Sequence, residues 1–242
     1  MPDSSAFPLP PAAFKGDSRP VEMGLVFDWL RQGWAMFTAH PGVWMAATLI
    51  FMVVELGVNI VPGFGFMASH LLLPVFFAGM SHACQRVSRG EEPHVNDLFH
   101  GFQRQSATAL LEVGLVFLGG VLAIVLLVLL LFLLVPGLKQ GLAMLIGGML
   151  TALLVFVLSV PLLMALWFAP ILVSQHGMKP MAACRASFAA CSKNLLPMGV
   201  FGLMLFILGF FALLSLALGM IVLLPVLAGA HYASYRDIFV GS

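Results

Sequence analysis

Long runs without a charged side chain constrain this chain more than any other feature of its sequence. Five such runs exceed 20 residues, and the two longest, Gln140–Met178 and Asn194–Tyr235, extend over 39 and 42 residues. An α-helix crosses the hydrocarbon core of a bilayer in about 20 residues. Asp, Glu, Lys and Arg together make up only 9% of the 242 residues, whereas a soluble domain usually carries about 25%. The sequence therefore predicts an all-α, polytopic membrane protein.

Composition excludes several other classes of protein. The 11 basic and 10 acidic residues nearly cancel, so the chain has no basic face for nucleic acid and no nucleic-acid partner is expected. The mean hydropathy of +1.06 argues against a soluble enzyme. Three cysteines, Cys84, Cys184 and Cys191, are odd in number and form no C-x-x-C motif. They are expected to be reduced thiols that act as small apolar fillers.

Six membrane spans result when the runs are divided at charges and turns. The 42-residue run must turn back once, and Ser215–Gly219 is the expected bend. The 39-residue run is interpreted as one long span, because Trp167 followed by Pro170 is typical of an interfacial exit. The predicted spans are 43–61, 64–85, 108–135, 141–168, 195–214 and 219–235.

The distribution of Lys and Arg predicts the orientation of the spans. Ten of the eleven basic residues fall on one side of the six-span arrangement, and only Lys139, between the third and fourth spans, falls on the other. By the positive-inside rule both termini are expected in the cytoplasm. Residues 1–22 hold five prolines and no continuous apolar core. They are expected to be a disordered leader rather than a signal peptide, followed by a single membrane domain over 23–242.

A threefold internal repeat is a second prediction. A short amphipathic segment precedes each odd-numbered span, and each even-numbered span contains a proline: Pro74, Pro161 and Pro225. The amphipathic segments share a small residue, an aromatic residue and, four positions later, a hydroxyl: Gly33-Trp34-Thr38, Gly101-Phe102-Ser106 and Ser187-Phe188-Ser192. We expect three repeats, at about 24–86, 93–175 and 179–238, each an interfacial helix followed by a membrane hairpin. Trp34, Phe102 and Phe188 are the expected interfacial anchors.

Several stretches resemble a known group of proteins. They are RQGWAMFTAHPGVWM, LLLPVFFAGMSHACQRVSRGE, WFAPILVSQHGMKPMAACRASFAAC and, most specifically, the closing YASYRDIF. From about Val26 onward the chain resembles a family of uncharacterised proteobacterial six-span inner-membrane proteins. The repeated unit is more distantly similar to the membrane domain of glycerophosphoryl diester phosphodiesterases. The resemblance implies a helical protein of the bacterial inner membrane but no established activity, so it implies no catalytic residue.

One polar cluster is predicted inside the membrane. Glu55 and Asn59 near the end of the first span and His70 near the start of the second lie at similar depth. An antiparallel hairpin would bring them together, with Glu55 and His70 within hydrogen-bonding distance or sharing a water molecule. Ionisable groups in a membrane are functional candidates by default, although a bond that only fastens the hairpin is the alternative. Glu112, close to the cytoplasmic boundary, is interpreted as structural: it either extends its carboxylate to the membrane surface or pairs with Arg104 or Lys193.

A weaker candidate for a metal or haem site gathers near the cytoplasmic ends of the second and sixth spans. It consists of His82, Cys84 and His231, near Tyr232 and Tyr235. Histidines on facing helices can hold a haem or a metal ion. No C-x-x-C-H or H-E-x-x-H motif supports such a site here, and neither a cofactor nor a resident metal is predicted.

Three functional hypotheses stay open at this level. The first is a non-catalytic inner-membrane scaffold, assembly factor or partner of a membrane complex, in contact with the bilayer and with a protein partner or a second copy. The second is a small proton-linked transporter or permease in which Glu55 and His70 titrate. The third is an immunity protein against a membrane-targeting toxin. The sequence contains no nucleophile–base arrangement and no phosphate-binding loop, so an enzyme is not expected.

Overall fold

The computed structural model describes residues 8, 14, 16–103, 106–134, 141–215 and 218–241, except the side chains of 141–143. Throughout these ranges the regular structure is helical, without a strand. Lys15, Arg104 and Lys139 and most of the predicted leader lie outside the described residues. The helices are α1 (Leu25–Ala39), α2 (Pro41–Val58), α3 (Phe64–Ser88), η2 (Val95–Phe102), α4 (Ala107–Leu134), α5 (Gly141–Trp167), α6 (Ala169–His176), α7 (Pro180–Lys193), α8 (Leu195–Leu214), α9 (Leu218–Tyr235) and η4 (Arg236–Val240).

Six of the described helical stretches are long and apolar enough to cross a membrane. This confirms the prediction of an all-α, polytopic membrane protein. Helix α5 ends at Trp167, where the sequence predicts the end of a single long span, although α6 continues the apolar stretch to His176. The stretches are Pro41–Val58, Phe64–Ser88, Ala107–Leu134, Met144–His176, Leu195–Leu214 and Leu218–Val240.

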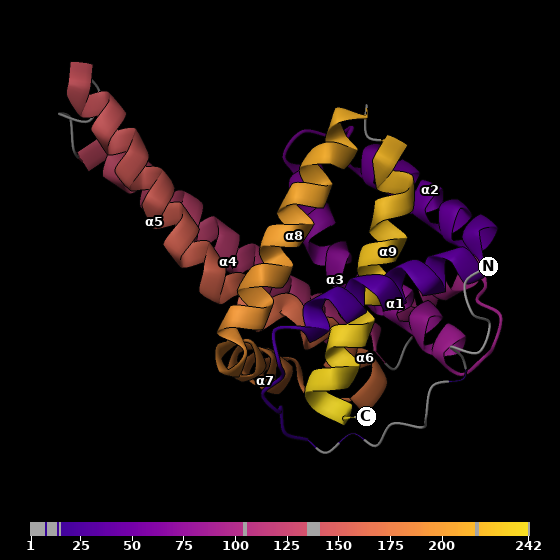
Figure 1. Cartoon of the computed structure of the whole chain (residues 1–242). Helices are drawn as coiled ribbons and strands as arrows, with labels where there is room; N and C mark the ends of the chain where they lie inside the picture. The colour runs from indigo at the N-terminus through magenta and orange to yellow at the C-terminus, as the bar shows by residue number, and fades with distance from the viewer. Residues whose placement is uncertain are drawn as a thin grey trace.

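The α4–α5 hairpin projects away from the other helices, which gather into a compact body (Figure 1). Only the first half of α4 is packed into that body, through buried residues such as Leu110 and Leu118. Leu129 and Leu133 in its second half and Met149 in α5 are exposed. The projecting part of the hairpin therefore presents apolar side chains to its surroundings, as a span in contact with lipid does.

The three short segments before the odd-numbered spans are separate helices, not parts of continuous spans. They are α1, η2 and α7, and η2 is a 3₁₀ helix. The predicted anchors Trp34, Phe102 and Phe188 are 51%, 42% and 43% exposed, so all three keep a large part of their surface outside the protein core. Helix α1 runs across α9 in Figure 1 and packs closely against it.

The buried face of α1 differs from the apolar stripe of Phe27, Leu30, Trp34 and Phe37 that the helical period of its sequence predicts, of which only Phe37 is buried. The structure buries Val26, Trp29, Gly33 and Met36, whereas Phe27 and Trp34 are exposed. The reason is that α1 is apolar on two sides, so periodicity alone does not tell which side faces the protein.

The small residue of each short helix lies at a crossing with a proline-containing span. A Cβ added at Gly33 would lie 2.2 Å from the carbonyl oxygen of Val226 in α9, and one at Gly101 would lie 2.3 Å from that of Val75 in α3. Ser187 of α7 donates a 2.7 Å hydrogen bond to the carbonyl oxygen of Met164 in α5. Small residues let membrane helices approach this closely. The threefold repeat itself stays a prediction.

The C-terminal segment that carries YASYRDIF joins several elements. Tyr232 lies 3.2 Å from Ser88 of α3 through their hydroxyl groups, and Tyr235 shares a hydrogen bond with His176 of α6. Asp237 accepts a 2.7 Å bond from the indole Nε1 of Trp29. Ser234 is fully buried. The segment therefore holds α1, α3 and α6 in place around the end of α9.

The described part of the predicted leader is also held by hydrogen bonds. The backbone N–H of Arg19 donates to the carbonyl of Ile238 at 2.9 Å. Asn194, at the junction of α7 and α8, accepts from the N–H of Val21 at 2.7 Å and donates to the carbonyl of Arg19 at 3.0 Å. The expectation of a disordered leader as far as residue 22 is thus wrong for this part, because a buried asparagine supplies the bonds that hold it.

Candidate functional site

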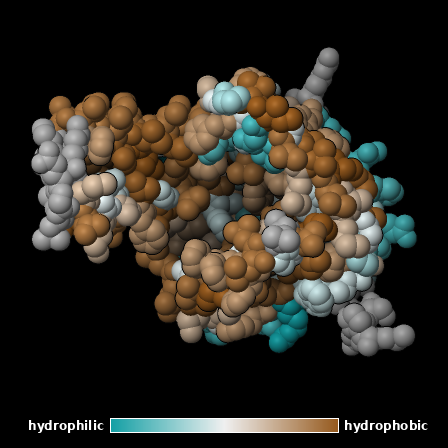
Figure 2. Space-filling model, turned by 90° about the horizontal axis from the view of Figure 1, so that it is seen from above, coloured by the Kyte–Doolittle hydropathy of each residue, from teal (hydrophilic) through white to brown (hydrophobic). Residues whose placement is uncertain are grey.

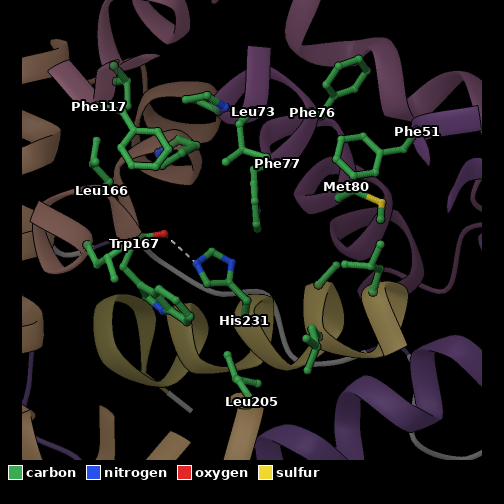
Figure 3. Close-up of a pocket in the computed structure, with 17 residues that line it drawn as sticks. Phe51, Leu73, Phe76, Phe77, Met80, Phe117, Leu166, Trp167, Leu205 and His231 are labelled. Carbon is green, nitrogen blue, oxygen red and sulfur yellow. Dashed lines mark hydrogen bonds between the residues drawn. The ribbon is translucent and has the colours of Figure 1, made fainter. Parts of the chain in front are cut away.

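An apolar cavity lies where the six spans meet, and the face seen in Figure 2 is hollowed at its centre. Its volume is about 380 Å³. Ligand sites in proteins typically occupy ~300–1,000 Å³ and are lined mainly by apolar groups. Every span contributes to its wall, which consists of Phe51, Leu73, Pro74, Phe76, Phe77, Met80, Val113, Phe117, Leu163, Leu166, Trp167, Pro170, Leu205, Leu224, Leu227, Ala228 and His231 (Figure 3).

His231 of α9 is the only titratable side chain among these 17 residues. Its residue is 6% exposed, and its Nε2 lies 2.8 Å from the carbonyl oxygen of Trp167. A carbonyl oxygen only accepts hydrogen bonds, so Nε2 carries the proton and Nδ1 of the neutral ring is left as an acceptor. Nδ1 is buried and has no hydrogen-bond partner among the described residues. In Figure 3 the ring stands on α9, with one nitrogen joined to the carbonyl of Trp167 and the other on the opposite side of the ring.

Aromatic neighbours hold the His231 ring in this orientation. Phe168 stacks on it at a centroid distance of 5.4 Å, with 20° between the ring planes. Trp167 and Phe77 meet the ring at steep angles, 72° and 71°, at 5.4 and 6.1 Å. These aromatic contacts and the hydrogen bond of Nε2 together fix the orientation of the His231 ring.

A break in the helical chain between α5 and α6 supplies the carbonyl that His231 binds. The hydroxyl of Ser187 accepts a 2.9 Å bond from the N–H of Phe168 and donates to the carbonyl of Met164, so it is inserted into an i→i−4 bond of the helix. Two residues after Phe168, Pro170 has no backbone N–H with which to form the next i→i−4 hydrogen bond of the helix. An inserted side chain and a proline are both recognised causes of helix breaks. The carbonyl of Trp167 lies inside this break.

A second polar atom of the same wall is also unsatisfied. The indole Nε1 of Trp167 is buried and has no partner among the described residues. A buried polar group without a partner is uncommon and calls for an explanation such as a bound molecule or water. His231 and Trp167, two residues of the cavity wall, thus each have a buried polar atom without a partner among the described residues.

The direct hydrogen bond predicted between Glu55 and His70 is not formed. Oε2 of Glu55 accepts a 2.7 Å hydrogen bond from Ser69, and Asn59 donates to both residues at 3.5 and 2.8 Å. His70 instead bonds through Nδ1 to the carbonyl of Phe66 in its own helix, at 2.7 Å. Glu55 and Asn59 are therefore brought together as predicted, but Ser69 takes the place of His70.

His70 turns toward α4 because it lies next to Ser69 in helix α3, and adjacent residues of a helix point about 100° apart. Its ring lies 4.9 Å from that of Phe117. Neither His70 nor Glu55 is among the residues that line the cavity. In this structure the two side chains neither bond to each other nor line this cavity, in contrast to what the transporter hypothesis assumes.

The candidates for a metal or haem site are not brought together either. His82 stacks on His100 of η2 at 3.6 Å, and its Nε2 lies 4.0 Å from a carboxylate oxygen of Asp97. His231 faces α5 instead, and Cys84 is fully buried. Over the described part of the chain no three His, Cys, Asp or Glu side chains form a group that could hold a metal ion. The reason is that His82 and His231 lie on helix faces that meet different neighbours.

The remaining predicted residues lie as follows. Glu112 is exposed, Lys193 donates to the carbonyl of Ser18 at 3.1 Å rather than to Glu112, and Arg104 lies outside the described residues. All three cysteines are free and buried. In α7, burial raises the pKa of the Cys184 thiol and raises that of Cys191 to about 12. These two thiols are therefore poor nucleophiles, in keeping with a role as apolar fillers.

Comparison with known proteins adds one relative. The chain is 26% identical over 195 residues to a protein of Burkholderia thailandensis named as a probable inner membrane protein, and the match covers 75% of this chain and 72% of that protein. No family model matches the chain. No solved structure matches it either. The relative agrees with the six apolar helices, and the chain is a polytopic membrane protein similar to a probable inner membrane protein.

Proposed function

We propose that this chain is a non-catalytic protein of the bacterial inner membrane that binds an apolar molecule in its central cavity. The observation that carries the proposal is the cavity wall, to which all six spans contribute and in which His231 is the single titratable residue. Apolar molecules dissolve in the bilayer, so the bilayer itself supplies the ligand. The inner-membrane location draws support from the named relative in Burkholderia thailandensis.

The composition of the wall favours binding over catalysis. Hydrolysis or group transfer needs a nucleophile or an acid–base pair in reach of the substrate. The lining residues offer one neutral imidazole, whose Nε2 is already bonded to a backbone carbonyl. Such a wall binds through shape and apolar contact, as ligand pockets generally do.

Lipid analysis of the purified full chain tests this proposal. The chain is extracted from bacterial membranes in a mild detergent, and the molecules that stay bound are measured by native mass spectrometry. Leu205→Trp fills the cavity from α8, and Leu208→Trp places the same side chain on the exposed side of that helix. We expect a bound apolar molecule in the wild type and in Leu208→Trp, and its loss in Leu205→Trp. Equal retention by the two variants would contradict the proposal.

A scaffold or assembly role is the second candidate. It is supported by the projecting α4–α5 hairpin, whose outer part has exposed apolar side chains on both helices (Figure 1). Photoreactive amino acids at Leu129 and Met149 would capture a protein partner or a second copy in the membrane. Exclusive labelling of lipid from these two positions would contradict the scaffold role and leave cavity binding untouched.

A further inference from the structure

We propose that the outer face of α7 binds the head group of an anionic phospholipid, whose phosphate pairs with the guanidinium group of Arg185. The outer face is the stripe formed by Met181, Arg185 and Phe188, on the side of α7 opposite to its buried side. None of these three residues lines the central cavity, so the inference does not depend on the molecule proposed to bind there. It adds a lipid of the membrane surface as a second partner of the chain.

The two sides of α7 have side chains of different size and polarity. Met181 and Phe188 are 53% and 43% exposed, and Arg185 is exposed between them. These positions are four and three residues apart, so the three side chains lie on one face of the helix. A basic residue next to large apolar residues is typical of a helix in the membrane interface. The side that packs on the rest of the protein has small residues: Ala183, Cys184, Ser187, Ala190 and Cys191.

The charge of Arg185 has no counter-charge within the described part of the chain. No ion pair or hydrogen bond joins its side chain to another described residue. The residues three and four positions away on either side of it in α7 are methionine, phenylalanine and two alanines. The sequence has no acidic residue between Glu112 and Asp237. The positive charge on this face therefore calls for a counter-charge from outside the chain.

Helix α1 contains the same arrangement with an internal counter-charge. Arg31 lies three residues before an exposed tryptophan, as Arg185 lies three residues before Phe188. The Nη1 of Arg31 forms a 2.9 Å salt bridge with a carboxylate oxygen of Asp28, three positions earlier in α1. The corresponding position of α7 holds Ala182, which is exposed. The two helices thus present an arginine and an aromatic residue at equal spacing, but only α1 supplies the carboxylate.

The composition of the face favours a lipid phosphate over a dissolved anion. A guanidinium group binds phosphate through two parallel hydrogen bonds. Met181 and Phe188 can enter the boundary between head groups and acyl chains, and the long side chain of Arg185 reaches from that depth to the phosphates. A dissolved anion would gain nothing from the two apolar side chains, and an exposed ion pair in water contributes little. A phospholipid supplies both the phosphate and the apolar surroundings.

A pair of photoreactive lipids tests the inference on the full chain. Diazirine derivatives of phosphatidylglycerol and phosphatidylcholine with the same acyl chains differ in the net charge of the head group. Each is added at the same mole fraction to phosphatidylcholine nanodiscs that contain the chain, and labelling of α7 peptides is measured by mass spectrometry after pepsin digestion. We expect phosphatidylglycerol to label α7 about fivefold more, as one basic residue at an anionic surface allows. Arg185→Gln should make the two lipids equal.

Moving a carboxylate between the two helices provides the matched variants. Ala182→Asp gives Arg185 the partner that Arg31 has, so α7 should lose its preference for phosphatidylglycerol although the arginine is retained. Asp28→Ala leaves Arg31 without its partner, so peptides of α1 should gain a preference. Ala182 is exposed and the Asp28 side chain is 45% exposed, so neither substitution reaches the protein core.

Three results would overturn the inference. The first is equal labelling of α7 by the two lipids in the wild type. The second is a preference that persists in Arg185→Gln, which would mean that another group attracts the lipid. The third is suppression of the labelling by dissolved glycerol phosphate but not by sodium chloride of the same ionic strength, which would mean that the face binds a free anion.

Discussion

At the scale of single residues, the side chain of Ser187 interrupts the helical hydrogen bonding between α5 and α6. Its hydroxyl bridges the N–H of Phe168 and the carbonyl of Met164, at 2.9 and 2.7 Å, inside a helix that would otherwise join these two groups directly. The residue is fully buried. The break that it helps to maintain places the carbonyl of Trp167 against His231.

Ser187→Ala should therefore destabilise the protein by about 1–3 kcal/mol, because two buried backbone groups lose their partner. The measurement is denaturant unfolding in mixed micelles. Ser192→Ala is the matched control, since Ser192 is in the same helix, is not fully buried and bonds to neither group. Equal stability of the two variants would mean that the helix closes across the break, and the bridge would then contribute nothing.

The polar cluster at the α2–α3 turn yields a second prediction at this scale. Glu55→Leu removes the acceptor of Ser69 and should cost about 1–3 kcal/mol of the free energy of unfolding. Glu55→Gln keeps an oxygen acceptor and should cost less. His70→Phe retains the ring between Phe66 and Phe117 and should cost under about 1 kcal/mol. A larger loss in His70→Phe than in Glu55→Leu would contradict the observed pairing.

At the scale of elements, the short helices pack on the spans through contacts that admit no side chain. Gly33 of α1 lies against the backbone of α9, where an added Cβ would come within 2.7 Å of the amide nitrogen of Ala230. The same is true from the other side, because a Cβ at Gly229 would lie 2.7 Å from the Cα of Gly33. Two helices in such contact must separate to make room for even one methyl group.

Gly33→Ala should destabilise the protein by about 1–3 kcal/mol through overpacking at this crossing. Gly202→Ala in α8 is the matched control, because a Cβ there meets nothing within 4 Å. In the control, the higher helix propensity of alanine should leave the stability unchanged or raise it. Thermal unfolding in detergent distinguishes the two variants, and a neutral Gly33→Ala would show that the α1–α9 contact is loose.

At the scale of the whole molecule, the orientation of the spans in the membrane is a further prediction that can be tested. Ten basic residues against one favour cytoplasmic termini. Lys139→Cys should then react with a membrane-impermeant thiol reagent in intact cells, whereas Ser192→Cys should react only after permeabilisation. The unmodified chain is the control, since its cysteines are buried and the pKa of Cys191 is raised to about 12. The reverse labelling pattern would contradict the orientation.

Much of the architecture could be predicted because it depends on local properties of the chain. The length and apolarity of a run decide whether it can span a bilayer, and both depend only on residues that follow one another in the sequence. Trp167 and Pro170 marked the end of α5 for the same reason. The small residues Gly33, Gly101 and Ser187 were recognised as a pattern, and each lies at a helix crossing.

What only the tertiary structure decided is which side of each helix meets which neighbour. In an apolar span every side looks alike to a sequence pattern, because lipid and protein core are equally apolar. Ser69 and His70 are adjacent in sequence, yet one bonds to Glu55 and the other faces Phe117. The cavity is the clearest case, since its wall comes from six spans and His231 in that wall bonds to a carbonyl at a break between two other helices. The sequence thus determined that the chain has six helices able to cross a membrane, and the packing of those helices alone determined where the cavity lies.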